Sequence, residues 1–192
     1  MAFSPSNSSI GQALRPGPSA IIVSRYNQSV TSVMRDGAIG AYLDRGGSES
    51  TLAILEAPGA YELISIARAA ASSGMYGSVV CLGCVIKGET SHDQHISSAV
   101  ANGLAQITVA TGVPVSFGVL TTNTNEQALA RAGGAKGNKG AEAMNAALDA
   151  ADAIVMLTHA KATNTPGVRF TPGLSPNDKL STAPKDNAKE SD

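Results

Sequence analysis

The chain has 192 residues, of which 43% are hydrophobic and 15% are charged, a composition typical of a folded domain and not of a disordered chain. Its formal net charge of −1 excludes the strongly basic surface with which many proteins bind nucleic acid. Because no apolar run reaches the length of a membrane span and the N-terminal residues do not resemble a secretory signal, we expect a cytoplasmic protein that binds neither membrane nor nucleic acid.

Four apolar segments read as buried strands, at residues 20–24, 51–57, 78–86 and 113–122. Apolar residues at helical spacing follow each of them. The expected helices end at Gly46 and Gly47, cover residues 58–74, begin at "GETSH" (88–92), and resume at Asn125, with a break at "GGAKGNKG" before a last helix to about Leu157. Such alternation predicts a three-layer α/β domain over residues 20–160, with a four-stranded parallel sheet and helices on both faces.

The two ends of the chain lack this periodicity. Residues 161–192 are rich in Pro, Ser, Thr, Asn and Lys, which is typical of disordered segments. We therefore expect a disordered C-terminal tail over 161–192 and a flexible N-terminal arm over 1–19.

All four strands are followed by residues suited to ligand contact, at the sheet edge where open α/β sheets bind ligands. Tyr26 and Tyr61 could stack on a flat ring, and backbone groups of Ala60, Tyr61, Cys84 and Ile86 could hydrogen-bond its edge. The alternative is that both tyrosines only cover the edge of the sheet.

The third strand leads directly into "KGETSHDQH" (87–95). Free N–H groups at a helix start, with the hydroxyls of Thr90 and Ser91, suit an anion. His92 would lie in the first turn, where it could transfer protons near neutral pH. The alternatives are that Thr90 or Ser91 only caps the helix and that His92 is an ordinary surface residue.

The segment "RAGGAKGNKG" (131–140) combines three cations with four glycines. It lacks the spacing of a nucleotide-binding P-loop, because Lys139 is followed by Gly140 and not by Ser or Thr. Arg131 could bind a phosphate through its forked guanidinium. The alternative is a flexible hinge between two helices.

Two cysteines and two histidines have the spacing C-x₂-C-x₇-H-x₂-H, at Cys81, Cys84, His92 and His95. Zinc fingers have a longer middle segment. Strand alternation also directs Cys81 and Cys84 to opposite faces of the sheet. We therefore expect no metal site here.

Five motifs, in this order, resemble the 6,7-dimethyl-8-ribityllumazine synthase family. They are "YN" (26–27), "PGAYE" (58–62), "LGCVIKGETSH" (82–92), "TGVPVSFGVLTT" (111–122) and "NEQALARAG…GNKG" (125–140). The resemblance implies a flavodoxin-like sheet and a role in riboflavin biosynthesis. It implies a cofactor-free condensation of 5-amino-6-(D-ribitylamino)uracil with 3,4-dihydroxy-2-butanone 4-phosphate, which yields 6,7-dimethyl-8-ribityllumazine, phosphate and water.

The resemblance also implies roles for individual residues. His92 would transfer protons, while Glu89, Thr90 and Arg131 would bind the phosphate. The pyrimidine and ribityl pocket would comprise Tyr26, Ala60, Tyr61, Glu62, Cys84, Val85 and Ile86, with Phe117 from a neighbouring subunit. The residues after His92 are "DQH", where the family often has an aromatic residue and then an acid. Assistance of His92 by an acid is therefore an open question.

The resemblance finally implies a homopentamer, because a pocket completed by a neighbour needs a ring of subunits. "RAGGAKGNKG" carries no insertion relative to the shell-forming pattern, which favours a 60-subunit icosahedral shell with riboflavin synthase as a further partner. Because a fold does not fix a function, the alternatives are a non-catalytic flavin- or lumazine-binding protein and a purely structural shell protein.

Overall fold

The computed structural model describes residues 16–167, so most of the expected N-terminal arm and residues 168–192 of the expected tail lie outside the described residues. The elements are β1 (Ser19–Ser24), α1 (Gln28–Asp44), the 3-10 helix η1 (Glu49–Thr51), β2 (Leu52–Ala57), α2 (Leu63–Ser72), β3 (Ser78–Ile86), α3 (His92–Thr111), β4 (Val115–Thr122), α4 (Asn125–Arg131), β5 (Ala132–Gly134), β6 (Gly137–Asn138) and α5 (Lys139–Thr163). No helix between residues 16 and 167 is both long and apolar enough to cross a bilayer.

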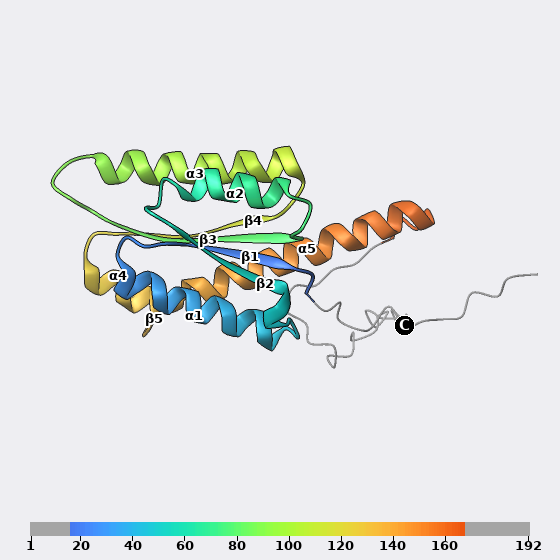
Figure 1. Ribbon diagram of the computed structural model, residues 1–192, viewed down its shortest axis with the longest axis horizontal. Helices are drawn as coiled ribbons and strands as arrows, with labels where there is room; N and C mark the ends of the chain where they lie inside the picture. The colour runs from blue at the N-terminus through green and yellow to red at the C-terminus, as the bar shows by residue number, and fades with distance from the viewer. Residues whose placement is uncertain (1–15, 168–192) are drawn as a thin grey trace, which may run out of the picture.

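β1 to β4 form one sheet in the order β2-β1-β3-β4, and each neighbouring pair is parallel. Helices α2 and α3 cover one face of this sheet, while α1, α4 and α5 lie against the other (Figure 1). Each face carries its own apolar core. The predicted three-layer α/β fold with a four-stranded parallel sheet is therefore confirmed.

Alternation along β3 decides which core each of its side chains enters. Cys81 packs with residues of α2 and α3, and Cys84 packs with residues of α1 and α5, so the predicted opposite orientation of the two thiols is confirmed. Both cysteines are free and buried. Burial disfavours the thiolate, raising the pKa of Cys84 to about 11 and that of Cys81 further. Both side chains are therefore uncharged core residues at neutral pH.

Two helix boundaries differ from those predicted. α2 begins at Leu63, because Ala60 and Tyr61 form a turn whose carbonyl oxygens accept bonds from the N–H groups of Leu63 and Ile64. α5 continues beyond Leu157 to Thr163 and ends at a left-handed Asn164. Most side chains of this last stretch are exposed, so the apolar periodicity that marks the buried face of a helix does not extend over it. Residues 161–163 are thus helical and do not belong to an irregular tail.

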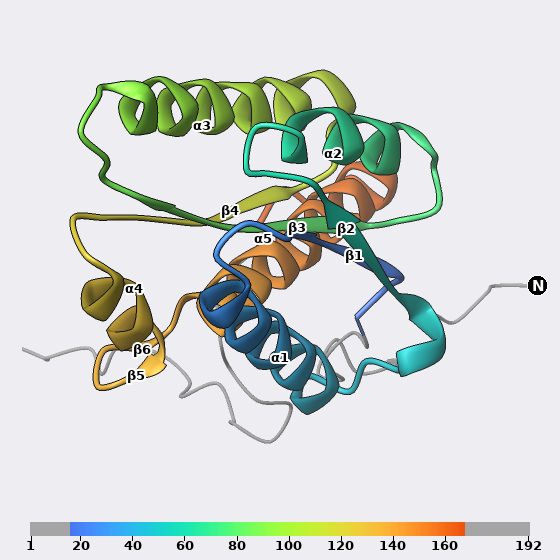
Figure 2. The same cartoon turned by 60° about the vertical axis from the view of Figure 1, so that its left-hand side comes forward.

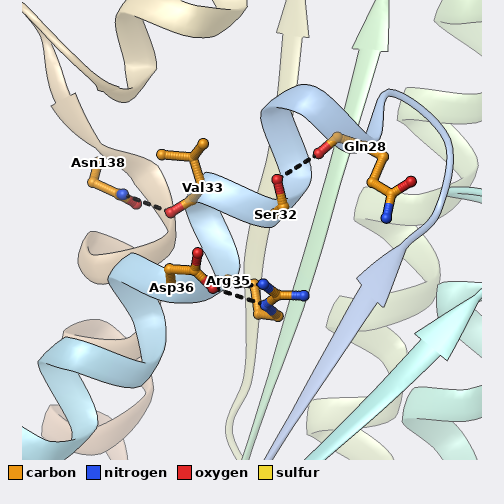
Figure 3. A network of polar contacts seen from close by, with 6 residues as sticks. All are labelled: Gln28, Ser32, Val33, Arg35, Asp36 and Asn138. Carbon is orange, nitrogen blue, oxygen red and sulfur yellow. Dashed lines mark hydrogen bonds and ion pairs between the residues drawn. The ribbon is translucent and has the colours of Figure 1, made fainter.

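The "GGAKGNKG" segment is not the hinge considered above, because residues 132–138 form the antiparallel hairpin β5–β6 beside α4 (Figure 2). Asn138 fixes this hairpin. Its Nδ2 atom donates to the carbonyl oxygens of Val33 in α1 (3.0 Å; Figure 3) and Ala132 (3.1 Å). Its Oδ1 atom accepts from the N–H groups of Gly140 (2.8 Å) and Ala141, so the same side chain caps α5. One amide thus joins the hairpin to both α1 and α5.

The tightest approach of α5 to α1 requires glycine at residue 140. A Cβ atom there would lie 1.8 Å from the carbonyl oxygen of Met34. We expect Gly140→Ala to lower the free energy of unfolding by about 1–3 kcal/mol, because the two backbones must separate. Urea denaturation would measure this change.

Gly40→Ala is the matched control, because a Cβ atom at Gly40 in α1 meets nothing within 4 Å. This substitution should leave stability unchanged or raise it by up to about 1 kcal/mol, since alanine favours helix more than glycine does. Equal destabilisation by both substitutions would contradict the packing argument.

Candidate active site

The segments that follow the four parallel strands meet at one edge of the sheet, here called the carboxyl edge (residues 25–27, 58–62, 87–91 and 123–124; Figure 1). Three hydrogen bonds join neighbouring strand ends. Arg25 N donates to Ala57 O (2.8 Å) and Lys87 N donates to Thr122 O (2.8 Å). Between them, Asn27 Nδ2 donates to Cys84 O (2.9 Å). The edge is therefore one connected surface.

Asn27 determines how Tyr26 is presented. Its backbone is left-handed, with φ 57°, a conformation that Asn adopts more readily than most residues. This turn directs the Asn27 amide inward to Cys84, while Tyr26 is 71% exposed. The ring of Tyr26 is thus largely exposed to solvent, and its stacking on a ligand stays a prediction.

The turn after β2 exposes one of its predicted site residues and buries another. Tyr61 is 57% exposed, whereas Ala60 is buried in the core between the sheet and α2. Both carbonyl oxygens are used by the first turn of α2. The backbone N–H groups of Ala60 and Tyr61 have no recorded acceptor within residues 16–167. They are the groups of this turn that could bind the edge of a heterocycle.

The end of β3 consists of a buried residue, Cys84, and two half-buried residues, Val85 and Ile86. Cys84 is only 2% exposed, and its carbonyl oxygen already accepts the Asn27 bond. Val85 packs toward α2 and α3, while Ile86 packs toward α1 and α5. The strand pleat directs the side chain of Val85 to one face of the sheet and those of Cys84 and Ile86 to the other, and the place of these three residues in a substrate pocket stays a prediction. A ligand could meet the second lone pair of the Cys84 carbonyl or the Val85 side chain.

His92 is the first residue of α3 and is exposed, as are Glu89 and Thr90 in the loop before it. The N–H of His92 donates to Thr90 Oγ1 at 3.4 Å, and Ser91 is the N-cap residue without a side-chain capping bond. Within residues 16–167, no hydrogen bond holds the His92 ring. Asp93 Oδ1 is buried and has no hydrogen-bond partner within residues 16–167.

Arg131 lies at the end of α4 and lines a cavity of about 590 Å³ below the end of β4. Lys136 and Lys139 line the same cavity, together with Thr122 and Glu126. All three cations lie in the ten-residue segment 131–140, of which the sequence indicated only Arg131 as a phosphate ligand. The hairpin brings them to one cavity by reversing the chain between Arg131 and Lys139.

Three other expected site residues, Tyr61, Glu62 and Phe117, do not line the cavity around Arg131. Tyr61 and Glu62 line a second cavity of about 610 Å³ between α2 and α3. Phe117, which is 37% exposed, pairs with Cys81 in the middle of the sheet. Cys84 lies three residues further along β3, which corresponds to about 10 Å. A single chain therefore does not bring Phe117 to the carboxyl edge.

No group of three or more His, Cys, Asp and Glu residues within 16–167 is arranged to hold a metal ion. Cys81 and Cys84, on opposite faces of the sheet, cannot bind one ion together.

Comparison with known proteins identifies the family that carries this arrangement. A family model described as 6,7-dimethyl-8-ribityllumazine synthase matches residues 18–154. The chain belongs to the 6,7-dimethyl-8-ribityllumazine synthase family. Two curated proteins of that name are similar to it. The one from Deinococcus deserti is 48% identical over 130 residues, covering 68% of this chain and 83% of the relative. The one from Desulfotalea psychrophila is 43% identical over 135 residues, covering 70% and 87%.

The lumazine synthase match extends from β1 into α5 and so includes the whole carboxyl edge. It confirms the resemblance that the five sequence motifs indicated. The cavity around Arg131 lies inside the matched region, as do His92 and Phe117. The roles of the individual residues stay predictions.

Proposed function

We propose that the protein is a 6,7-dimethyl-8-ribityllumazine synthase. It condenses 5-amino-6-(D-ribitylamino)uracil with 3,4-dihydroxy-2-butanone 4-phosphate in riboflavin biosynthesis. The observation that carries this proposal is the family match across the complete carboxyl edge. The free cysteines are consistent with action in the reducing cytoplasm.

The chemistry suits the groups at this edge. An aryl amine attacks a ketone and loses water to form an imine, phosphate is then eliminated, and the ring closes with loss of a second water. Each step moves protons, which an exposed histidine such as His92 can give and accept near neutral pH. No hydride is transferred, so the reaction needs no redox cofactor. Holding two substrates side by side supplies a large part of the acceleration.

Each substrate has its own set of groups. We propose that Tyr26 and Tyr61 stack on the pyrimidine, while Ala60, Glu62, Cys84, Val85 and Ile86 surround the ring and its ribityl chain. For Cys84 and Ile86 the contact would be made through the backbone, in view of their burial and orientation. Glu89 and Thr90 would offer backbone N–H groups to the phosphate, and Arg131 would bind its charge.

One assay tests the proposal: mixing the two substrates with the protein and following the absorbance of the lumazine. Product formation would support the enzyme, and its absence under conditions in which riboflavin binds would support a non-catalytic flavin-binding protein. Family membership and the presence of both His92 and Arg131 in the matched region favour the enzyme.

We also propose that the site is completed between subunits of a homopentamer. The support is the position of Phe117, about 10 Å along the sheet from Cys84 in its own chain but partly exposed for a neighbour. Twelve such pentamers would close into a 60-subunit shell, which could enclose riboflavin synthase as a partner.

Mixed pentamers test the shared site. We expect His92→Ala and Phe117→Ala each to reduce activity. When the two variant chains are co-expressed and mix at random, about a quarter of the sites combine an intact His92 with an intact Phe117 from the neighbouring chain, so about a quarter of the sites should be restored. Light scattering on the same samples gives the assembly size. If mixing restores no activity, or if a monomer is active, the shared site is refuted. A lone active pentamer would refute only the shell.

A further inference from the structure

The cations of the Arg131 cavity already have a partner. Glu142, in the first turn of α5, contacts both Arg131 and Lys139 through the same oxygen atom. Glu142 Oε2 lies 3.6 Å from Arg131 Nη2 and 3.3 Å from Lys139 Nζ. One carboxylate oxygen therefore pairs with one cation from α4 and with another from α5.

This contact is weak enough to exchange. At 3.6 Å, the Arg131–Glu142 pair is an ion pair without a hydrogen bond. The side chains of Arg131 and Glu142 are 40% and 47% exposed, so water screens their attraction. A phosphate oxygen that forms short, charge-assisted bonds with Arg131 and Lys139 would be the stronger partner.

The position of the cations fits such an exchange. Arg131, Lys136 and Lys139 line the cavity, which is wide enough for a phosphate group. Glu142 contacts two of them from the first turn of α5, where the helix dipole stabilises a carboxylate whether or not a cation is present. Glu142 can thus release Arg131 and Lys139 without becoming an isolated charge.

We propose that Glu142 is an internal counter-ion that holds Arg131 and Lys139 in the free protein and is replaced by the phosphate group of the substrate. The inference rests on the proposed function, which makes Arg131 the phosphate ligand. Glu142 acts only through the two cations, so it is a positioning residue and not a catalytic one. It lowers the affinity for phosphate and so favours departure of the phosphate product.

The test is the affinity of the full-length protein for inorganic phosphate, measured by calorimetry at low salt. Glu142→Gln keeps the size of the side chain and removes its charge. We expect this variant to bind phosphate about two- to fivefold more tightly, the range that an exposed ion pair supplies. The KM for the phosphorylated ketone should fall by a similar factor, while the KM for the pyrimidine stays unchanged.

Two controls test whether tighter phosphate binding results from the release of Arg131 and Lys139 by Glu142 or from the removal of any negative charge near the cavity. Glu126→Gln removes a carboxylate that lines the same cavity but has no recorded ion pair within residues 16–167, so its effect should be smaller. In an Arg131→Ala background, the gain from Glu142→Gln should shrink, because a double-mutant cycle isolates the coupling between the two residues.

Three results would overturn the inference about Glu142. Weaker phosphate binding by Glu142→Gln would overturn the inference and make Glu142 a support for the cations. Equal gains from Glu126→Gln and Glu142→Gln would also overturn it, as would phosphate binding to neither the wild type nor Glu142→Gln. Failure of the proposed function would be seen in a different experiment, as the absence of lumazine formation by the wild-type protein, and is therefore distinguishable from failure of the inference about Glu142.

Discussion

Replacing His92 by alanine is expected to reduce turnover by about 10- to 10⁴-fold, the range between catalysis by proximity alone and catalysis dominated by proton transfer. The affinity for both substrates should change little, because the exposed ring makes no hydrogen bond within residues 16–167 that the substitution would remove. Steady-state kinetics with direct binding measurements would separate the two effects. His92→Ala should also unfold at the wild-type temperature, since the residue is at the exposed start of α3.

His95→Ala is the matched control for this experiment. His95 lies one turn further along α3, is also exposed, and has only a long contact from its Nε2 atom to Ser91 Oγ (3.5 Å). We expect near-normal turnover from this variant. Unchanged turnover in His92→Ala would remove His92 from the mechanism, and an equal loss in both variants would indicate damage to the start of α3 instead of lost proton transfer.

Arg131→Ala should weaken binding of the phosphorylated ketone by about 1.5–3 kcal/mol, the usual contribution of a hydrogen bond to a charged group. Binding of the pyrimidine should be nearly unaffected. Arg131→Lys should recover only part of the loss, because an ammonium lacks the planar fork of the guanidinium. Titration of each substrate separately would measure these differences.

Arg35→Ala is the control for loss of an arginine. Arg35 is on α1, where it pairs with the neighbouring Asp36 (2.7 Å; Figure 3) and does not line the Arg131 cavity. We expect no change in either affinity. Equal weakening of both substrates by Arg131→Ala would contradict a phosphate-specific role for Arg131.

The sequence determined the sheet and its approximate boundaries. β3 was predicted at residues 78–86 and is found there, because a strand buried on both faces reads as a continuous apolar run. The start of α3 was predicted within residues 88–92, and the helix begins at His92 with Ser91 as its N-cap residue. These features depend on local composition and periodicity, which are properties of the chain itself.

Which residues share a pocket was decided by the tertiary structure. Cys84, Val85 and Ile86 are adjacent in the sequence, but the strand pleat sends Val85 to one core and the other two to the opposite core. Arg131 and Lys139 are eight positions apart, and both contact Glu142 Oε2. Their positions depend on the hairpin between them, which Asn138 joins to α1 by a hydrogen bond. Hydrogen bonds between distant segments carry no local sequence signal, so this arrangement became visible only in the folded chain.

The position of Phe117 shows the same division. The resemblance implied that Phe117 acts in the site of a neighbouring subunit, and its register opposite Cys81 places it about 10 Å along the sheet from Cys84 in its own chain. Strand register follows from how the whole sheet pairs and packs, and a local pattern cannot specify it. The sequence by itself therefore determined the family and the chemical groups, and the fold decided which groups one chain can bring together.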